Sequence, residues 1–335
     1  METNKNFYRG AGLLVSFLLL GISFLCSVRY GFVSIGWQDI WASIFNYNNG
    51  DMDQVVAREA RLPRAMVAAA VGGSLAIAGA ILQAVTRNPL ASPSVLGINA
   101  GAALAVVAAI TVLSIRETSA LMWVSFFGAG IAAGLVYFLG SLGRDGLSPL
   151  KIILAGSALT ALFSSITQGM LVHDESGLQD VLFWLTGSVA GRTMDMLTPV
   201  LPYMAAGWIG AFALSRQWSL LLMGEESAKG LGQHIGFVKL AAGVIVILLA
   251  GSAVAVAGPI GLIGIIVPHI ARGLAGIDYR WLLPYSAALG GSLLLIADIA
   301  ARFIIIPLEI PVGIMTAAIG APFFIYLARK EMSKR

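Results

Sequence analysis

Long apolar runs alternate with short polar segments along the whole chain. A helix that crosses a membrane needs about 20 mostly apolar residues, because the hydrocarbon core is about 30 Å thick and each residue advances the helix by about 1.5 Å. The pattern therefore predicts an all-α integral membrane protein with about ten transmembrane helices in a single domain, residues 1–335. The runs cover approximately residues 11–31, 65–84, 96–115, 120–141, 151–172, 196–215, 238–257, 259–277, 281–304 and 311–328.

Two segments fit this pattern less well. The eighth run is short and carries Gly261, Gly264 and Pro268, residue types that weaken or break a helix. The stretch 177–191 is too short to span a bilayer, so we expect it to lie at a membrane interface.

The first apolar run follows basic residues, as the core of a secretory signal peptide would. A signal peptide has an apolar core of only about 7–15 residues and a small-residue cleavage pattern after it. The run that starts at residue 11 is longer, and no such pattern stands out. We therefore predict that it is retained as the first transmembrane helix.

The composition supports a membrane protein and limits its chemistry. Hydrophobic residues make up 58% of the chain and charged residues 11%, whereas a soluble domain averages about 25% charged residues. The single cysteine, Cys26, excludes an internal disulfide and a cysteine-based metal site. A net charge of +4, scattered along the chain, does not indicate nucleic-acid binding.

The lysines and arginines predict which side of the membrane each segment faces, because cytoplasmic segments carry an excess of both. With the N-terminus in the cytoplasm, ten alternating spans place fourteen of the 21 basic residues inside, including all the lysines, and seven outside. We therefore predict that residues 1–10, the segment 216–239 and the tail 329–335 are cytoplasmic. The seven outer residues are Arg29, Arg58, Arg61, Arg64, Arg116, Arg192 and Arg302.

Three of these outer arginines lie three residues apart. Arg58, Arg61 and Arg64 would share roughly one face of a helix, and Pro63 suits the first turn of that helix, where its missing N–H costs no hydrogen bond. A single arginine at this position could simply reach lipid phosphates. Three on one face, on a side without lysine, instead favour an acidic protein or ligand as the partner.

Glycine is abundant, with 39 residues, and much of it lies inside the apolar runs. Examples are the segment 71–80 and the pair Gly130 and Gly134, which are four residues apart. Small residues at this spacing let helix backbones approach closely in lipid. The glycines therefore predict a tightly packed bundle.

Ionisable residues are rare within the predicted spans. Asp298 and Arg302 lie four apart in one run, so they can pair on one helix face. No series of intramembrane carboxylates offers a proton relay, and the three histidines lie far apart in the sequence, which argues against a metal site. Zinc-peptidase, serine-hydrolase and phosphate-loop motifs are all missing. We therefore predict no catalytic residue, no metal and no cofactor, and ATP-driven transport would need a separate ATPase chain.

The longest inner segment is 216–239. Within it, "GEESAKGLG" (224–232) predicts a short helix parallel to the membrane, with Glu225, Glu226 and Lys229 at helical spacing and glycines that end it. The residues alone allow two interpretations, a solvated connector or a docking place for an ATPase.

The fifth run carries polar residues towards its outer half, namely Ser164, Ser165, Thr167 and Gln168. They cover more than one helix face, so we expect some of them to line a translocation pathway and the others to bond neighbouring helices.

Three segments resemble a known family. They are "RLPRAMVAAAVGGSLAIAGAILQAVTRNPLASPSVLGINAGAAL" (61–104), "GPIGLIGIIVPHIARGLAG" (258–276) and "ADIAARFIIIPLEIPVGIMTAAIGAPFFIYLARK" (297–330). Each strongly resembles the permeases of ATP-binding-cassette (ABC) importers for iron–siderophores, haem and vitamin B12. The resemblance implies a type II ABC importer bundle of ten helices in a bacterial cell membrane, without a cofactor of its own.

The same resemblance implies partners and the residues that meet them. The partners would be a second permease subunit in a homodimer or paralogous heterodimer, two cytoplasmic ATPase subunits, an extracytoplasmic substrate-binding protein and membrane lipid, but no nucleic acid. By motif position, Arg61, Arg64 and Arg302 would meet glutamates of the binding protein. The ATPase-coupling loop of the family falls on 221–232, which gives the coupling residues Gly224, Glu225, Glu226, Ala228, Gly230, Leu231 and Gly232.

The function that the resemblance implies is import of a ferric siderophore or a related large metal chelate, with haem or vitamin B12 as alternatives. A secondary transporter driven by an ion gradient would need intramembrane carboxylates or broken helices in two corresponding halves, and Asp298 alone gives this alternative little support. A structural subunit without a transport role would explain neither the outer arginines nor the segment 224–232.

Overall fold

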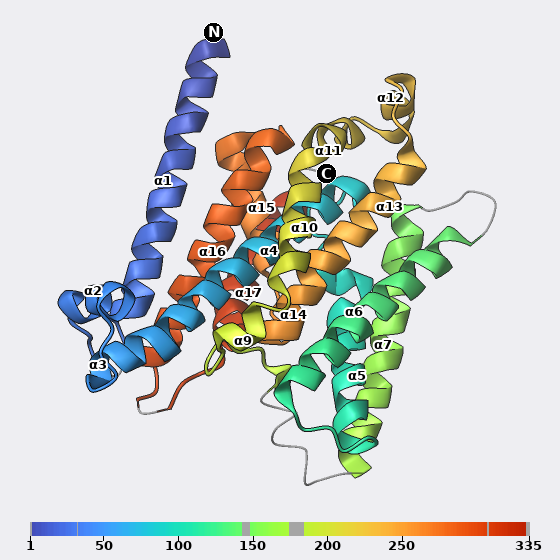
Figure 1. Ribbon diagram of the computed structural model, residues 1–335. Coiled ribbons are helices and arrows are strands. Elements are labelled where there is room, and N and C mark those ends of the chain that lie inside the picture. The colour runs from blue at the N-terminus through green and yellow to red at the C-terminus, as the bar shows by residue number, and fades with distance from the viewer. Residues whose placement is uncertain (1, 32, 143–147, 174–183, 307, 333–335) are drawn as a thin grey trace.

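The computed structural model describes residues 2–31, 33–142, 148–173, 184–306 and 308–332, and this part of the chain is helical without a β-strand. The arrangement is shown in Figure 1. The elements are α1 (Glu2–Arg29), α2 (Trp37–Phe45), α3 (Met52–Val55), the π-helical turn η1 (Val56–Arg61), α4 (Leu62–Thr86), the 3-10 turn η2 (Pro93–Leu96), α5 (Ile98–Thr111), α6 (Thr118–Ser141), α7 (Pro149–His173), α9 (Met194–Leu197), α10 (Leu201–Ala213), α11 (Ser215–Leu222), α12 (Glu225–Gly230), α13 (Ile235–Val246), the π-helical turn η3 (Ile247–Gly251), α14 (Ser252–Ala257), α15 (Ile263–Ala275), α16 (Tyr279–Phe303) and α17 (Val312–Met332).

Each of the ten predicted apolar runs contains an apolar helix. Six helical segments of the described chain are long and apolar enough to cross a membrane. The other four runs hold shorter apolar helices, namely α5, α10, α15 and the part of α17 that covers Val312–Ile325. A helix of about 13 residues rises about 20 Å, less than the hydrocarbon thickness. The helices α5, α10 and α15 are therefore too short to cross the membrane by themselves, whereas α17, with 21 residues, is long enough.

The interrupted eighth run shows why its helix is short. Gly258 and Leu262 both have positive φ angles, 72° and 68°, and a helix cannot continue through such residues. The helix α15 consequently begins only at Ile263. Residues 177–183 of the predicted interfacial stretch lie outside the described residues. The predicted N-terminal segment 1–10 belongs to α1, which begins at Glu2.

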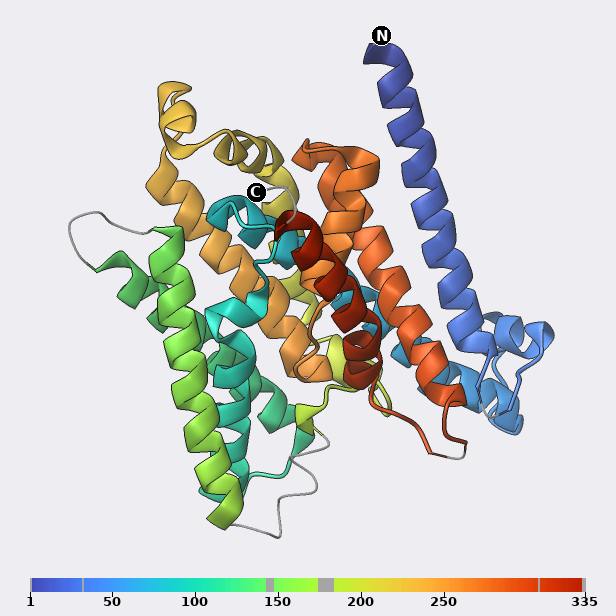
Figure 2. The ribbon, with the colours of Figure 1, turned by 180° about the vertical axis from the view of Figure 1, so that it is seen from behind.

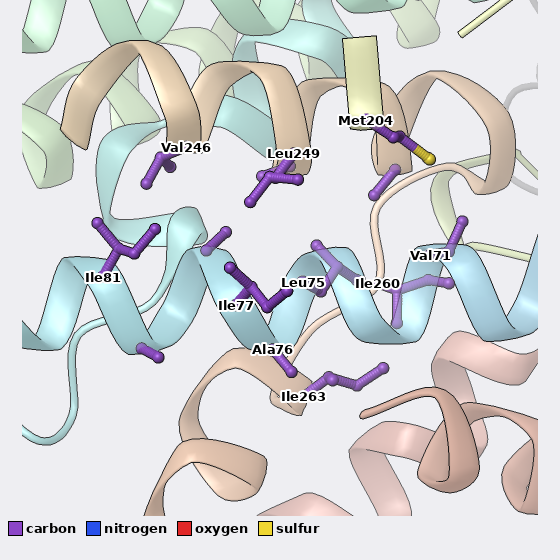
Figure 3. Packing of buried hydrophobic residues seen from close by; sticks show 14 of the residues in the cluster. Val71, Leu75, Ala76, Ile77, Ile81, Met204, Val246, Leu249, Ile260 and Ile263 are labelled. Atoms are coloured by element: carbon purple, nitrogen blue, oxygen red, sulfur yellow. The ribbon is translucent and has the colours of Figure 1, made fainter. Parts of the chain in front are cut away.

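The helix α4 is the centre of the bundle. In the apolar stretch of the span that contains α4, 83% of the residues are buried inside the subunit. The corresponding share is 22% for α1 and 17% for α7, so these two helices lie at the periphery. Figure 3 shows Ile77 and Ile81 of α4 on the side of Val246 and Leu249, with Ile263 of α15 near Ala76. Lipid is as apolar as these side chains, so close packing rather than the hydrophobic effect stabilises such contacts within a membrane.

Glycines allow two helices to touch the backbone of α4. A Cβ atom built on Gly72 would overlap the carbonyl oxygen of Gly290 in α16, and one built on Gly79 would overlap that of Gly264 in α15. The glycine-rich segment 71–80 therefore has the packing role that its composition predicts. The spacing of Gly130 and Gly134 predicts the same role, but no such approach occurs there, because a Cβ on Gly134 would meet nothing within 4 Å.

The two ends of the bundle carry different segments. Figure 1 shows the N-terminus, the C-terminus and α12 towards one end, and α2, α3 and α9 towards the other. Seen from behind in Figure 2, α17 and α7 lie on the near side of the molecule. The charge pattern predicts that both termini and the segment 224–232 face the cytoplasm, and this orientation stays a prediction. The end with α12 is called the inner end below, and the opposite end the outer end.

Candidate functional site

The predicted docking arginines come together at the outer end, where three helices meet. Arg61 ends the π-helical turn η1, Arg64 stands in the first turn of α4 with Pro63 beside it, and Arg302 lies in the last turn of α16. Arg58 is separate from them, because its guanidinium lies over the ring of Tyr47, 4.3 Å from the centroid.

Arg61 and Arg302 both bind the carboxyl end of α1. Arg61 donates to the backbone oxygens of Val28 at 3.1 Å and Arg29 at 2.6 Å, and also to that of Val33. Arg302 donates to the oxygens of Ser27 and Tyr30, both at 2.8 Å. The last carbonyls of a helix have no partner within the helix, and its dipole favours a positive charge there. Both side chains are buried, so these two arginines cap α1.

Asp298 joins Arg64 to Arg302. Its carboxylate accepts from Arg64 at 2.7 Å and 3.1 Å, and it pairs with Arg302 one turn along α16, as the four-residue spacing predicts. Arg64 also pairs with Glu309 at 2.8 Å, and Glu309 belongs to the segment between α16 and α17. The exposed fractions of the side chains are 1% for Asp298, 12% for Arg64 and 27% for Glu309. These five residues, Arg61, Arg64, Asp298, Arg302 and Glu309, are called the outer charge cluster.

A cavity of about 480 Å³ lies against the outer charge cluster. Arg192, which follows the stretch 177–191, also lines it. Burial lowers the pKa of the Arg192 guanidinium, which still stays charged at neutral pH. The other charged lining residues are Asp53, Glu59, Arg61, Arg64, Arg302 and Glu309. Of the three predicted docking arginines, Arg64 is the most exposed, and its accessible partner is Glu309, a residue that the sequence pattern did not single out.

At the inner end, the segment 224–232 forms the short helix that its sequence predicts. The helix α12 covers Glu225–Gly230, with a positive φ of 109° at Gly224 before it and of 82° at Gly232 after it. Ala228 is buried, whereas Gly230 and Leu231 are exposed. Figure 1 shows α12 projecting at this end of the molecule.

The two glutamates of α12 have different surroundings. The carboxylate of Glu225 lies 2.8 Å from the Lys239 ammonium of α13 and 3.6 Å from the guanidinium of Arg87. Glu226 is exposed. The sequence pattern treated the two glutamates alike, because neither Lys239 nor Arg87 is a neighbour of Glu225 along the chain. We call Glu225, Lys239 and Arg87 the inner charge cluster.

The predicted pathway residues of α7 differ in exposure, and the one hydrogen bond among them in the described part of the chain stays within α7 and does not reach a neighbouring helix. Thr167 is buried and donates to the backbone oxygen of Phe163 at 2.7 Å, and Ser164 is half-buried. Ser165 and Gln168 are exposed on the outside of the subunit. Polar groups at this position favour a water-filled or protein-covered surface over lipid.

In the described part of the chain, no group of three or more histidine, cysteine, aspartate or glutamate residues could hold a metal ion. Among the described residues of the membrane-spanning helices, Asp298 carries the buried carboxylate. It is already paired with Arg64 and Arg302. An ion-gradient mechanism therefore finds no free intramembrane carboxylate among the described residues.

Apolar helices long enough to cross a membrane, packed through glycines, define the chain as a membrane protein that spans the bilayer several times. The chain belongs to the FecCD transport family, whose model matches residues 19–330. It is therefore a multi-pass bacterial membrane permease rather than an enzyme.

Two curated relatives and one solved structure show how close the similarity is. The probable siderophore transport system permease protein YfiZ of Bacillus subtilis is 52% identical over 319 residues, 95% of this chain and 96% of the relative. The ferric enterobactin permease FepD of Escherichia coli is 39% identical over 83% of both chains. A solved metal-chelate type ABC transporter in an inward-facing conformation aligns with a TM-score of 0.84 and 30% identity, over 96% of this chain and 99% of that one.

Proposed function

We propose that this chain is the permease subunit of an ABC importer that translocates a ferric siderophore or a related large metal chelate. The observation that carries the substrate class is the 52% identity, over nearly the whole chain, with a permease named for siderophore transport. Relatives named for ferric citrate and ferric enterobactin support the same chemistry. Haem and vitamin B12 are the alternative substrates of the same architecture.

We also propose its partners and its orientation. A second permease subunit would complete the pathway, two ATPase subunits would bind at the inner end, and an extracytoplasmic binding protein would dock at the outer end. The inner end would face the cytoplasm, because the excess of lysine and arginine falls there. The exposed residues of α12, above all Glu226, Gly230 and Leu231, would enter a cleft of the ATPase.

The exposed polar face of α7 would line the pathway, which gives a test of the function. Vesicles that contain this chain with the ATPase and binding protein of its own system should take up ferric siderophore only when ATP is supplied. In a Cys26→Ser background, a water-soluble thiol reagent should block uptake by Gln168→Cys but not by Leu162→Cys, because Leu162 is an exposed apolar residue on another side of α7.

Each outcome of this assay has a meaning. Uptake of haem or cobalamin in place of ferric siderophore would reassign the substrate. Uptake driven by an ion gradient without ATPase would contradict the importer class. A Gln168→Cys variant that transports normally after labelling would remove this face of α7 from the pathway.

We propose that the outer charge cluster receives the binding protein at Arg64. In the free permease Glu309 already neutralises part of Arg64, so a carboxylate of the binding protein would compete with Glu309. Arg61 and Arg302 cap α1, so they would support the site from below rather than reach the partner. Charge complementarity of this kind improves orientation and association rate more than affinity.

This competition predicts that removing the carboxylate of Glu309 strengthens binding of the partner instead of weakening it. Glu309→Gln should tighten binding of the substrate-binding protein by up to about fivefold at low salt, which corresponds to about 1 kcal/mol, the upper end of the range for an exposed ion pair. Surface plasmon resonance on permease in nanodiscs would measure it. Glu59→Gln is the matched control, because it removes the same charge from the same cavity without freeing an arginine. Weaker or unchanged binding by Glu309→Gln would contradict docking at Arg64.

A further inference from the structure

The inner charge cluster begins with a buried lysine. Lys239 lies in the second turn of α13, and its side chain is 6% exposed. It lines a cavity of about 140 Å³ whose other walls are almost entirely apolar, with Leu82 and Val85 from α4 and Ile152 from α7. An ammonium group in such surroundings requires an opposite charge or hydrogen-bond acceptors.

Glu225 brings a negative charge to this lysine from the coupling segment. It is the first residue of α12, and its carboxylate lies 2.8 Å from the Lys239 ammonium. The same carboxylate lies 3.6 Å from Arg87, which caps the carboxyl end of α4 with a left-handed φ of 49°. One side chain of α12 therefore contacts both α13 and the end of the central helix.

We infer that Glu225 is a positioning residue, whose contacts with Lys239 and Arg87 make α12, α13 and α4 move together when the ATPase moves α12. This inference rests on the proposed docking of an ATPase at α12. It separates the two glutamates of the segment, because Glu225 acts within the permease and only Glu226 is available to the partner.

The environment of Lys239 explains why the three helices would move as one body. Moving α12 away from α13 separates a carboxylate from a buried ammonium, and the attraction between opposite charges is much stronger in apolar surroundings than in water. The helix α13 continues through η3 into α14. The helix α4 connects the two clusters, because Arg64 of the outer charge cluster lies in its first turn and Arg87 of the inner charge cluster directly follows its last residue. A displacement of α12 would therefore reach both the middle of the bundle and its outer end.

The first measurement is hydrogen exchange of residues 226–232 in the permease alone, in nanodiscs. Lys239→Met and Glu225→Gln should each speed amide exchange there by about tenfold or more, because α12 loses its attachment to α13. Lys229→Met and Glu226→Gln are matched controls for charge, since each removes the same charge from an exposed position of α12. Equal exchange in the attached and control variants would overturn the inference.

The second measurement is the amount of substrate transported per ATP hydrolysed by the complete complex in vesicles. Lys239→Met should lower this ratio at least threefold while ATP hydrolysis continues, and Lys239→Arg should restore it, because the arginine keeps the charge. A ratio equal to that of the wild type in Lys239→Met would overturn the inference, and so would a loss that Lys239→Arg does not restore.

A third variant separates the inference from the function on which it rests. A Cβ atom built on Gly230 would meet no atom of another part of the chain within 4 Å, so Gly230→Trp tests the docking of the ATPase and leaves the inner charge cluster intact. It should abolish ATPase binding without a change in hydrogen exchange. If Gly230→Trp binds the ATPase normally, the proposed docking at α12 is wrong, and the exchange data still decide whether Glu225 attaches α12 to α13.

Discussion

Replacing Asp298 with asparagine should destabilise this permease by about 3–5 kcal/mol, the usual cost of removing one partner from a buried ion pair. The carboxylate is 1% exposed and lies between the guanidinium groups of Arg64 and Arg302. Asparagine keeps the shape but leaves two largely buried positive charges without their shared counter-charge. The apparent Tm of the protein in detergent should fall by at least about 5 °C.

The control for this experiment is Glu309→Gln. It also removes one carboxylate from Arg64, but Glu309 is 27% exposed, so solvent screens the lost interaction and the cost should stay below about 1 kcal/mol. If Asp298→Asn and Glu309→Gln shift the Tm equally, Asp298 does not hold the cluster together.

Gly79→Ala should be almost as damaging, although alanine favours a helix more than glycine by about 1 kcal/mol. The added Cβ would overlap the carbonyl oxygen of Gly264, a backbone atom of α15 that no rotamer change can move. Overpacking of this kind costs about 1–3 kcal/mol and occasionally more. The folded, monodisperse fraction after purification and the Tm should both fall.

The matched substitution is Gly134→Ala, also within a long apolar helix. Nothing lies within 4 Å of a Cβ at Gly134, so the gain in helix propensity should leave the Tm unchanged or slightly higher. A rise in stability with Gly79→Ala would mean that α4 and α15 do not touch at this glycine.

The sequence by itself was enough to predict the class of fold and the family. Each predicted apolar run contains an apolar helix, because a chain in lipid must satisfy its backbone hydrogen bonds within helices and must contain enough apolar residues to cross. The short helix at 224–232 was also predictable, since glycines on both sides of a charged turn end a helix locally. Such signals lie within about 20 neighbouring residues, so they can be read from the chain alone.

Only the tertiary structure decided which of the charged residues are free. The spacing of Arg61 and Arg64 predicts a shared face open to a partner, yet Arg61 is buried against the carboxyl end of α1, about 30 residues earlier in the chain. Arg64 meets Asp298 and Glu309 more than 230 residues later in the chain, and Glu225 meets Arg87 more than 130 residues earlier. Helix periodicity reports which side chains share a face but not which helix packs against that face, because packing depends on shape at long range. The assignment of each charge to a structural or an exposed role was therefore determined by the packing of α1, α4, α13 and α16.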